Sequence, residues 1–396
     1  MASGLAESAS ALRLRMAQLS NTSEDDWYLV SKARQGMQMV LRASGQATHR
    51  SEVLTQLFTC VTAIDPILTA GLEPRYVDID PNTLSVDPSL ARMDERTCAV
   101  VLQNTFGITN VESATALREA AHAVGALVLE DSAHCVGRLA TDAGQNPVAD
   151  VSVHSFGVEK ILAGTYFGGA VWVNPAMENK VVEQTVREAL AALPPMEATF
   201  ERATRKYRNQ MRMITHLPHA AGQALRAKWE RKGTLEPAVS EQERRGETNH
   251  EPSIPSPWVC EQALAALDGL QDNEANRRAC VRAYLEELGE NVARDLRVPA
   301  AIRQTHAQPL LRFPVFVNGQ SKADAAIAAI ASLGFYAPAW PRPLLVPGML
   351  DASAYGLSQG FEDWPVSQRL SSDIVCLPTD IDPSRVHEVV QAIHNL

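Results

Sequence analysis

The residues best suited to chemistry are one acid and one lysine, each placed just beyond an apolar run. Residues 126–129, ALVL, lead into an acidic pair that ends at Asp131. Residues 150–156, DVSVHSF, alternate as a strand does, and Lys160 follows on a turn that opens with a glycine. Open α/β sheets bind their ligands beyond the carboxyl ends of strands, so Asp131 and Lys160 are candidate site residues from neighbouring strand ends.

This pair meets the needs of pyridoxal 5′-phosphate. A lysine amine forms a Schiff base with the aldehyde cofactor, and a carboxylate paired with the protonated pyridine nitrogen keeps the ring an electron sink. Gly164 and residues 168–169 permit tight backbone approach before a further strand at residues 170–173. The alternative interpretations are a solvated surface lysine at Lys160 and a helix N-cap at Asp131.

Three short motifs resemble the signature of a known family. The sequences EDSAH at 130–134 and SFGVEK at 155–160 and the glycine pair at 168–169 follow the order and spacing of the DegT/StrS-type nucleotide-sugar aminotransferases, which are fold-type I pyridoxal-phosphate enzymes. The resemblance implies an α/β fold, with a large domain whose mostly parallel central sheet lies between helices. A small C-terminal α+β domain is expected to follow.

The resemblance also assigns roles to the residues of these motifs. It implies that Lys160 forms the Schiff base, that Asp131 pairs with the pyridine nitrogen, that His134 contacts the ring 3-hydroxyl and that Ser155 binds the phosphate. Alternatively, His134 is a hydrogen-bonded core histidine. Ser155, in turn, is alternatively a polar residue on a strand face.

Five further positions match segments that surround the cofactor in the family. Ala33 and Arg34 open a helical pattern where the family binds the phosphate, although the family's usual glycine is missing. Phe58 and Cys60 match positions near the face of the cofactor ring, with core packing as an equal alternative. Asn104 follows an apolar strand and is expected either to face the cofactor or to lie in a surface turn.

The elements around these residues predict a parallel crossover. Residues 99–102 and 126–129 are apolar strands, and a helix is predicted between them at 111–124. Asn110 can cap this helix and Gly125 can end it. A strand, a helix and a strand within this length indicate a parallel pair.

The chain divides into three predicted regions. Residues 1–27 form an amphipathic or partly disordered leader whose composition fits a helix packed on a partner chain. Residues 28–245 form the large cofactor-binding domain with a helical extension. Residues 246–396 contain an interdomain helix and the small C-terminal domain. Within the extension, the basic run RATRKYRNQMR at 202–212 indicates a solvated helix face or, alternatively, contact with an anionic substrate.

Composition narrows the classes of function. The 396-residue chain has a formal net charge of −10, which argues against general nucleic-acid binding. Its six scattered cysteines form no C-x-x-C pair and no Cys/His cluster, so reduced thiols are predicted rather than disulfides or a metal site. The N-terminus lacks a signal-peptide pattern and no run of about 18 apolar residues occurs, so we expect a cytoplasmic protein that does not enter a membrane.

Taken with the resemblance, these observations predict a pyridoxal-phosphate-dependent aminotransferase. It is expected to move an amino group from an amino acid, with glutamate as the expected donor, to a nucleotide-linked keto sugar or a related cyclic ketone. Lys160 favours transamination over dehydration, because relatives that dehydrate deoxysugars lack this lysine. The alternatives are a pyridoxal-phosphate lyase or racemase, and a non-catalytic member with a binding or regulatory role. The family also implies a homodimer with its sites near the subunit boundary.

Overall fold

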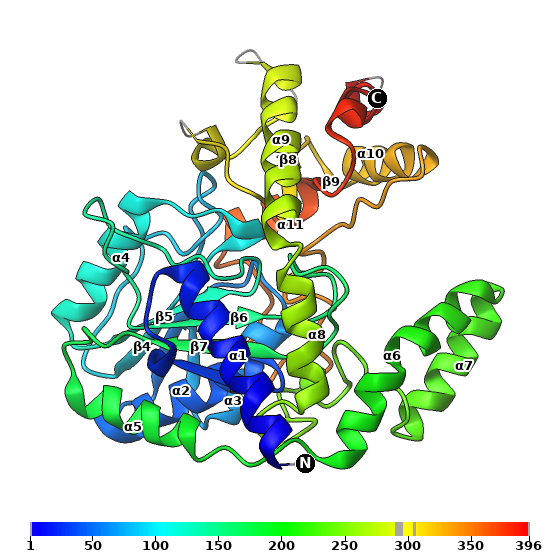
Figure 1. Cartoon of the computed structure of the whole chain (residues 1–396). Coiled ribbons are helices and arrows are strands. Elements are labelled where there is room, and N and C mark those ends of the chain that lie inside the picture. The colour runs from blue at the N-terminus through cyan, green and yellow to red at the C-terminus, as the bar shows by residue number, and fades with distance from the viewer. Residues whose placement is uncertain (1, 290–295, 304–305, 395–396) are drawn as a thin grey trace.

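A large sheet organises the first half of the chain in the computed structural model, which describes residues 2–289, 296–303 and 306–394. Its strands are β1 (Trp27–Val30), β2 (Glu52–Thr55), β3 (Glu73–Tyr76), β4 (Thr97–Gln103), β5 (Leu127–Ser132), β6 (Val151–Ser155) and β7 (Gly169–Val173). They lie in the order β1-β7-β6-β5-β4-β2-β3, and Figure 1 labels β4 to β7 of this sheet. β2 to β6 run parallel, whereas β7 is antiparallel to both β1 and β6. The predicted mostly parallel sheet is confirmed.

Helices cover both faces of this sheet, and every residue of β4 to β7 is buried, as a doubly covered parallel sheet requires. α2 (Ala33–Thr48) and α5 (Lys180–Ala191) pack on one face of the sheet, where Val101 of β4 belongs to the same apolar cluster. α4 (Val111–Ala123) packs on the other face, against Val100 and Val128. Successive residues of a strand point to opposite faces, so one continuous apolar run serves both helix layers.

The predicted crossover between β4 and β5 is present. Asn110 caps α4, because its side-chain oxygen accepts a hydrogen bond of 2.8 Å from the backbone N–H of Ser113. Gly125 follows the helix with a φ of +71°, a left-handed conformation that glycine adopts without strain. The chain then enters β5 parallel to β4, and Gln103 lies beside Asp131 in the register.

The N-terminal segment forms the predicted helix, α1 (Ala2–Ser20), but it packs on its own chain. Leu12 and Met16 are buried against Cys260 and Leu267 of α8 (Pro257–Leu267). The helix therefore has an intramolecular partner where the sequence suggested a second subunit.

The second half of the chain adds a helical hairpin and a smaller layer of structure. The helices are α3 (Asp65–Thr69), α6 (Ala198–His216), α7 (His219–Arg231), α9 (Leu270–Leu288), α10 (Gln320–Ser332), α11 (Pro365–Asp373) and α12 (Val386–His394). Short 3₁₀ turns occur at Glu24–Asp26, Val61–Ala63, Thr105–Gly107, Glu243–Arg245, Ala300–Arg303 and Pro383–Arg385. β8 (Arg312–Phe316) and β9 (Ile374–Pro378) form an antiparallel pair, consistent with the predicted small α+β domain.

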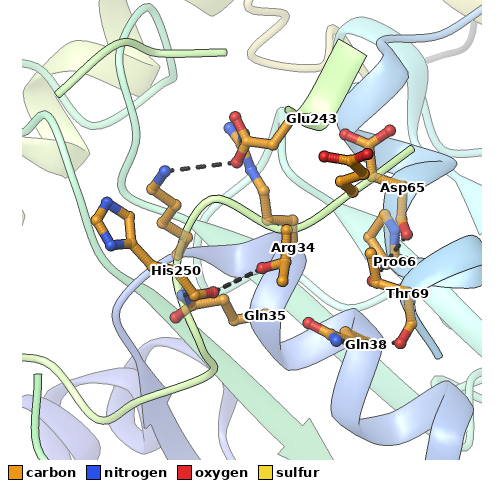
Figure 2. A pocket seen from close by; sticks show the side chains of 11 residues that line it. Arg34, Gln35, Gln38, Asp65, Pro66, Thr69, Glu243 and His250 are labelled. Atoms are coloured by element: carbon orange, nitrogen blue, oxygen red, sulfur yellow. Dashed lines mark hydrogen bonds and ion pairs between the residues drawn. The ribbon is translucent and has the colours of Figure 1, made fainter. Parts of the chain in front are cut away.

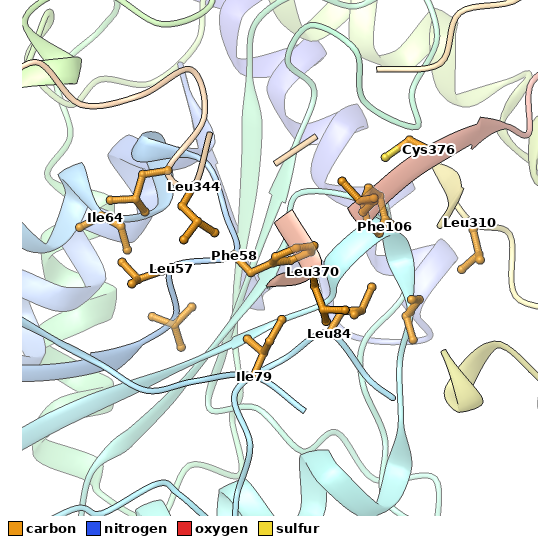
Figure 3. Close-up of a cluster of buried hydrophobic side chains, with 14 of the residues drawn as sticks. Leu57, Phe58, Ile64, Ile79, Leu84, Phe106, Leu310, Leu344, Leu370 and Cys376 are labelled. Carbon is orange, nitrogen blue, oxygen red and sulfur yellow. The ribbon is translucent and has the colours of Figure 1, made fainter. Parts of the chain in front are cut away.

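One segment of the small domain joins the large one. Val346 accepts a hydrogen bond of 3.0 Å from the N–H of Val61 and donates one of 3.0 Å to the carbonyl of Thr59. Beside this strand-like contact, Leu344 and Leu370 pack with Phe58 in a buried cluster (Figure 3). The small domain is thus anchored next to the carboxyl edge of the sheet.

Among the helices that the structure describes, none has the length and apolar character needed to cross a bilayer.

Candidate active site

A cavity of about 620 Å³ lies beyond the carboxyl ends of β4, β5 and β6. Lys160, Asp131 and His134 all line it, together with residues of α2 and the small domain. The two strand-end residues singled out by the sequence therefore share one cavity. This is the place in the fold where open α/β sheets bind ligands.

Asp131 is a buried carboxylate with few compensating partners. It is 7% exposed, and its Oδ1 accepts one hydrogen bond of 2.9 Å, from the N–H of Ala133. Burial raises the pKa of Asp131, while this hydrogen bond and the charge of Lys160 act in the opposite direction. The adjacent Glu130 points away from the cavity and accepts hydrogen bonds from Asn104 and Ala140. Asp131 thus presents an acid to the cavity that a cationic ligand group would stabilise.

Lys160 lies on the turn after β6, and its half-buried side chain reaches the cavity. Burial lowers the pKa of its amine, and the nearby Cys60 and Asp131 groups partly oppose that shift. A lysine whose pKa is lowered has a larger neutral fraction at neutral pH. Such an amine is suited to act as a nucleophile and as a base.

His134 is held in one tautomer. The backbone N–H of Phe106 donates a hydrogen bond of 2.9 Å to Nδ1 of His134, so in the neutral ring Nε2 carries the proton. Burial lowers the pKa of His134 well below its usual value, and the charges of Lys160 and Arg312 add to this shift. Trp340 packs edge-on against the ring at a centroid distance of 5.0 Å. The imidazole therefore stays neutral and has an Nε2–H donor.

A buried charge network stands at the start of α2, where no side chain caps the helix. Lys32 Nζ lies 2.6 Å from Oε1 of Glu236, and Arg34 Nη1 lies 2.6 Å from Oε1 of Glu243. Figure 2 shows Arg34, Glu243 and Asp65 gathered beside the first turn of the helix. The arginine and lysine side chains add positive charge to a helix end that already attracts anions.

Close backbone approach shapes the neighbouring part of the wall. A Cβ atom on Gly169 would lie 2.7 Å from the carbonyl oxygen of His154 and 3.0 Å from the backbone N of Ala33, so only glycine fits. Ala33 and Ser155 both line the cavity, and Ser155 Oγ accepts a hydrogen bond of 3.2 Å from the N–H of Gly157. The turn after β6 and the start of α2 are thereby held together.

The remaining predicted positions separate into two groups. Cys60 and Asn104 line the cavity, although the amide nitrogen of Asn104 already donates hydrogen bonds to Glu130 and to Ser132. Phe58 does not line it, because its ring is fully buried in the cluster of Figure 3. The structure thus brings together eight of the nine predicted positions.

Several cavity residues were not predicted from the sequence. Tyr336, Trp340 and Arg342, which follow α10, and Arg312 of β8 line the cavity from the small domain. Tyr166 and Phe167 do so from the loop before β7, and Tyr207, Met211 and Arg226 from α6 and α7. The predicted helical extension and its basic run at 202–212 were the sequence signals for the hairpin. Within the described residues, no group of three or more His, Cys, Asp or Glu side chains is arranged to hold a metal ion.

Solved structures with the same architecture come from aminotransferases. The chain aligns with TlmJ from Streptoalloteichus hindustanus at a TM-score of 0.67 and 19% identity, covering 98% of this chain and 90% of that one. It aligns with the putative sugar aminotransferase Spr1654 from Streptococcus pneumoniae at 0.69 and 16%, covering 98% and 91%. DesI, solved with its TDP-sugar product, gives 0.67 and 21%, covering 98% and 84%. The fold is therefore that of the fold-type I transferases, as predicted.

The sequence also matches the model of a known protein family. Residues 28–214 match the model of the DegT/DnrJ/EryC1/StrS aminotransferase family. The match covers the part of the chain that carries the motifs, and it confirms the resemblance drawn from them. A pleiotropic regulatory protein from Geobacillus stearothermophilus is 32% identical over 100 residues, a match that spans 22% of this chain and 27% of that relative.

Proposed function

We propose that the protein is a pyridoxal-phosphate-dependent aminotransferase that moves an amino group from an amino acid, with glutamate as the expected donor, to a keto sugar. The observation that carries the proposal is the shared cavity of Lys160 and Asp131, in a chain whose residues 28–214 match an aminotransferase family. This chemistry requires a lysine with a lowered pKa and a buried acid in one cleft.

The residues of the cavity fit the cofactor on four counts. Asp131 is a buried carboxylate with one hydrogen-bond donor among the described residues, so a protonated pyridine nitrogen would supply the missing partner. The uncapped start of α2 at Ala33, with Ser155 nearby on the same cavity, offers donors for a phosphate group. His134 Nε2–H is a donor suited to the ring hydroxyl oxygen. Lys160 provides the amine that would bond to the aldehyde.

The protein side of the reaction follows from these positions. When bound, the cofactor supplies an electron sink for the carbanion formed at the donor's α-carbon. With the cofactor bound, Lys160 Nζ would be placed to take the α-proton of the donor and to return a proton at the acceptor carbon. Asp131 would hold the pyridine nitrogen in its protonated form, because a buried anion stabilises a nearby cation. Trp340 and Phe106 pack around His134 and hold its donor in place.

The nucleotide-linked form of the keto sugar is supported by comparison and by charge. DesI was solved with a TDP-sugar product, which shows that the same fold accommodates such a molecule. The cavity also holds more cationic than anionic side chains, although the chain as a whole is acidic. A related cyclic ketone is the other acceptor class that we propose.

Two further proposals concern the state of the protein. We infer a homodimer with sites near the subunit boundary from the family, and a cytoplasmic location from the six free cysteines. Sedimentation or sizing tests the first proposal, since a fully active monomer would contradict it.

The visible spectrum of the purified protein tests the proposed function. Incubation with pyridoxal 5′-phosphate should give a visible band that is absent from Lys160→Ala, and glutamate should then convert that band in wild type. A matched control is Lys180→Ala, an exposed lysine at the start of α5. A wild type that shows no visible band after incubation with excess cofactor and removal of the unbound cofactor would refute the proposal.

The same measurement separates the alternatives. A lyase or racemase would bind the cofactor and show its visible band. An amino donor would not convert that band in a way that a keto compound reverses. The relative from Geobacillus stearothermophilus carries the name of a regulatory protein, so a non-catalytic role is the second candidate. A non-catalytic role predicts no visible band in wild type or in Lys160→Ala.

A further inference from the structure

The hairpin of α6 and α7 projects from the body of the molecule (Figure 1). Its charge contrasts with that of the whole chain. The two helices carry eight basic residues, Arg202, Arg205, Lys206, Arg208, Arg212, Arg226, Lys228 and Arg231, against the two acidic residues Glu201 and Glu230. The rest of a chain with net charge −10 is correspondingly more acidic. The hairpin is therefore a local source of positive potential.

An aromatic cluster fixes the base of the hairpin beside the active cavity. Phe167 contacts Phe200 and Tyr207 edge-on, at centroid distances of 6.0 Å and 5.4 Å, and Tyr166 lies 5.1 Å from Tyr207. Leu235 and Val259 complete this buried group. Since Tyr166 and Phe167 belong to the loop that follows Lys160, the hairpin is packed directly on the catalytic loop.

Three residues of the hairpin enter the cavity wall: Tyr207, Met211 and Arg226. The Nε of Arg226 donates a hydrogen bond of 2.8 Å to Glu230, one turn further along α7. A guanidinium group has five N–H donors, so this contact leaves most of them for a ligand. Tyr207 and Met211, one turn apart on α6, add an aromatic and an apolar surface to the same wall.

The charges lining the cavity are unequal. The cationic residues are Lys32, Arg34, Lys160, Arg226, Arg312 and Arg342, and the acidic residues are Asp131 and Glu159. Buried carboxylates already neutralise the first two cations.

The outer arginines have weaker partners. Arg226 is paired with Glu230, which is 32% exposed, and Arg312 with Asp380, which is 47% exposed. Arg342 is paired with the exposed Asp324. Ion pairs with solvent-exposed carboxylates are weak, so the outer cavity retains its attraction for an anion.

We propose that the hairpin is the acceptor-recognition wall of this enzyme, and that Arg226 binds a phosphate group on the acceptor, distal to its keto carbon. The inference rests on the proposed function, because it assigns one substrate of that reaction to one wall of its cavity. Tyr207 and Met211 form the surface against which the uncharged part of the acceptor lies. The basic outer faces of α6 and α7 raise the local concentration of such an anion.

The test is a titration of the cofactor-loaded enzyme with thymidine diphosphate as the probe. Wild type is expected to bind it, and Arg226→Gln is expected to bind it about 10- to 100-fold more weakly, the usual effect of losing a hydrogen-bonded charge. Arg226→Lys, which keeps the charge but loses the planar fork, should fall between the two. Arg231→Gln, an exposed arginine of the same helix outside the cavity wall, should match wild type.

The outcomes separate this inference from the function beneath it. Conversion of the cofactor band by glutamate is measured in wild type and in Arg231→Gln, and it should be the same in both, because Arg231 lies outside the cavity wall. No binding of the probe to wild type, or equal losses in Arg226→Gln and Arg231→Gln, would overturn the assignment of the hairpin. Failure of the glutamate reaction in wild type would instead count against the proposed function.

Discussion

Glu243 is expected to be the acid on which the charge network at the start of α2 most depends. It is 4% exposed and lies 2.6 Å from Arg34 and 3.5 Å from Lys32, while its other oxygen accepts a hydrogen bond of 2.7 Å from the N–H of Ser240. Glu243→Gln keeps the shape and one acceptor but removes the charge. Lys32 would then keep its ion pair with Glu236, whereas Arg34 would lose its ion pair with Glu243.

The pKa of Glu243 sets the size of this effect. Burial opposes its charged form, but Arg34 and Lys32 outweigh burial and lower the pKa from 4.5 to about 2. At about 1.4 kcal/mol per pH unit, this shift corresponds to about 3 kcal/mol of stability at neutral pH. The folded pKa is depressed, so the contribution is complete above the unfolded pKa and is lost as the pH falls from about 4.5 towards 2.

Denaturant unfolding at several pH values measures it. At pH 7 the free energy of unfolding of Glu243→Gln should be about 3 kcal/mol below that of wild type, a loss in the range seen when one partner of a buried pair is removed. The difference should shrink as the pH approaches 3. The control Glu241→Gln, exposed and two residues away, should match wild type throughout. A loss below about 1 kcal/mol at pH 7, or one that does not change with pH, would refute the electrostatic account.

Two other substitutions test the geometry of the cavity wall. Gly169→Ala places a methyl group against backbone atoms of His154 and Ala33, which have no side-chain freedom to yield, so we expect a loss of about 1–3 kcal/mol in unfolding free energy and weaker cofactor binding; an unchanged melting temperature would show that the strand and helix can separate. His134→Gln keeps a donor near the position of Nε2 and should retain cofactor affinity within about 3-fold, whereas His134→Leu should lose about 10-fold in a cofactor titration. Equal affinities for the two His134 variants would remove the donor role.

The parts of this site that the sequence predicted are those encoded locally. Asp131 follows an apolar run and Lys160 follows an alternating one, both patterns predict strands, and the sheet places the two strand ends at one edge. Asn110 and Gly125 delimit α4 by capping chemistry that acts within one turn of the helix. Such features depend on near neighbours in the chain, and those neighbours can be identified without a structure.

The parts that were not predicted depend on contacts between distant segments. Lys32 pairs with Glu236, which lies 204 residues further along, and Trp340 reaches His134 from the small domain. No local sequence pattern identifies either partner. A lone glutamate or tryptophan in a loop has the same neighbours in the sequence whether its side chain faces a cavity or solvent. The helix α1 shows the same limit, since its composition suggested packing on a partner chain, whereas it packs on α8 of its own chain.

Phe58 and Cys60 show how a single turn decides which residue reaches a site. In an extended strand, the side chains of Phe58 and Cys60 would point to the same side. A family match that placed one of them near the cofactor therefore also placed the other there. The N–H of Thr59 donates a hydrogen bond of 2.8 Å to the carbonyl of Leu57, which closes a three-residue turn centred on Phe58. This turn interrupts the alternation, so the phenyl ring enters the core while the thiol lines the cavity. The aromatic ring expected at the cofactor face is therefore absent from this loop, and Trp340 of the small domain is the nearest aromatic neighbour of His134 by ring distance.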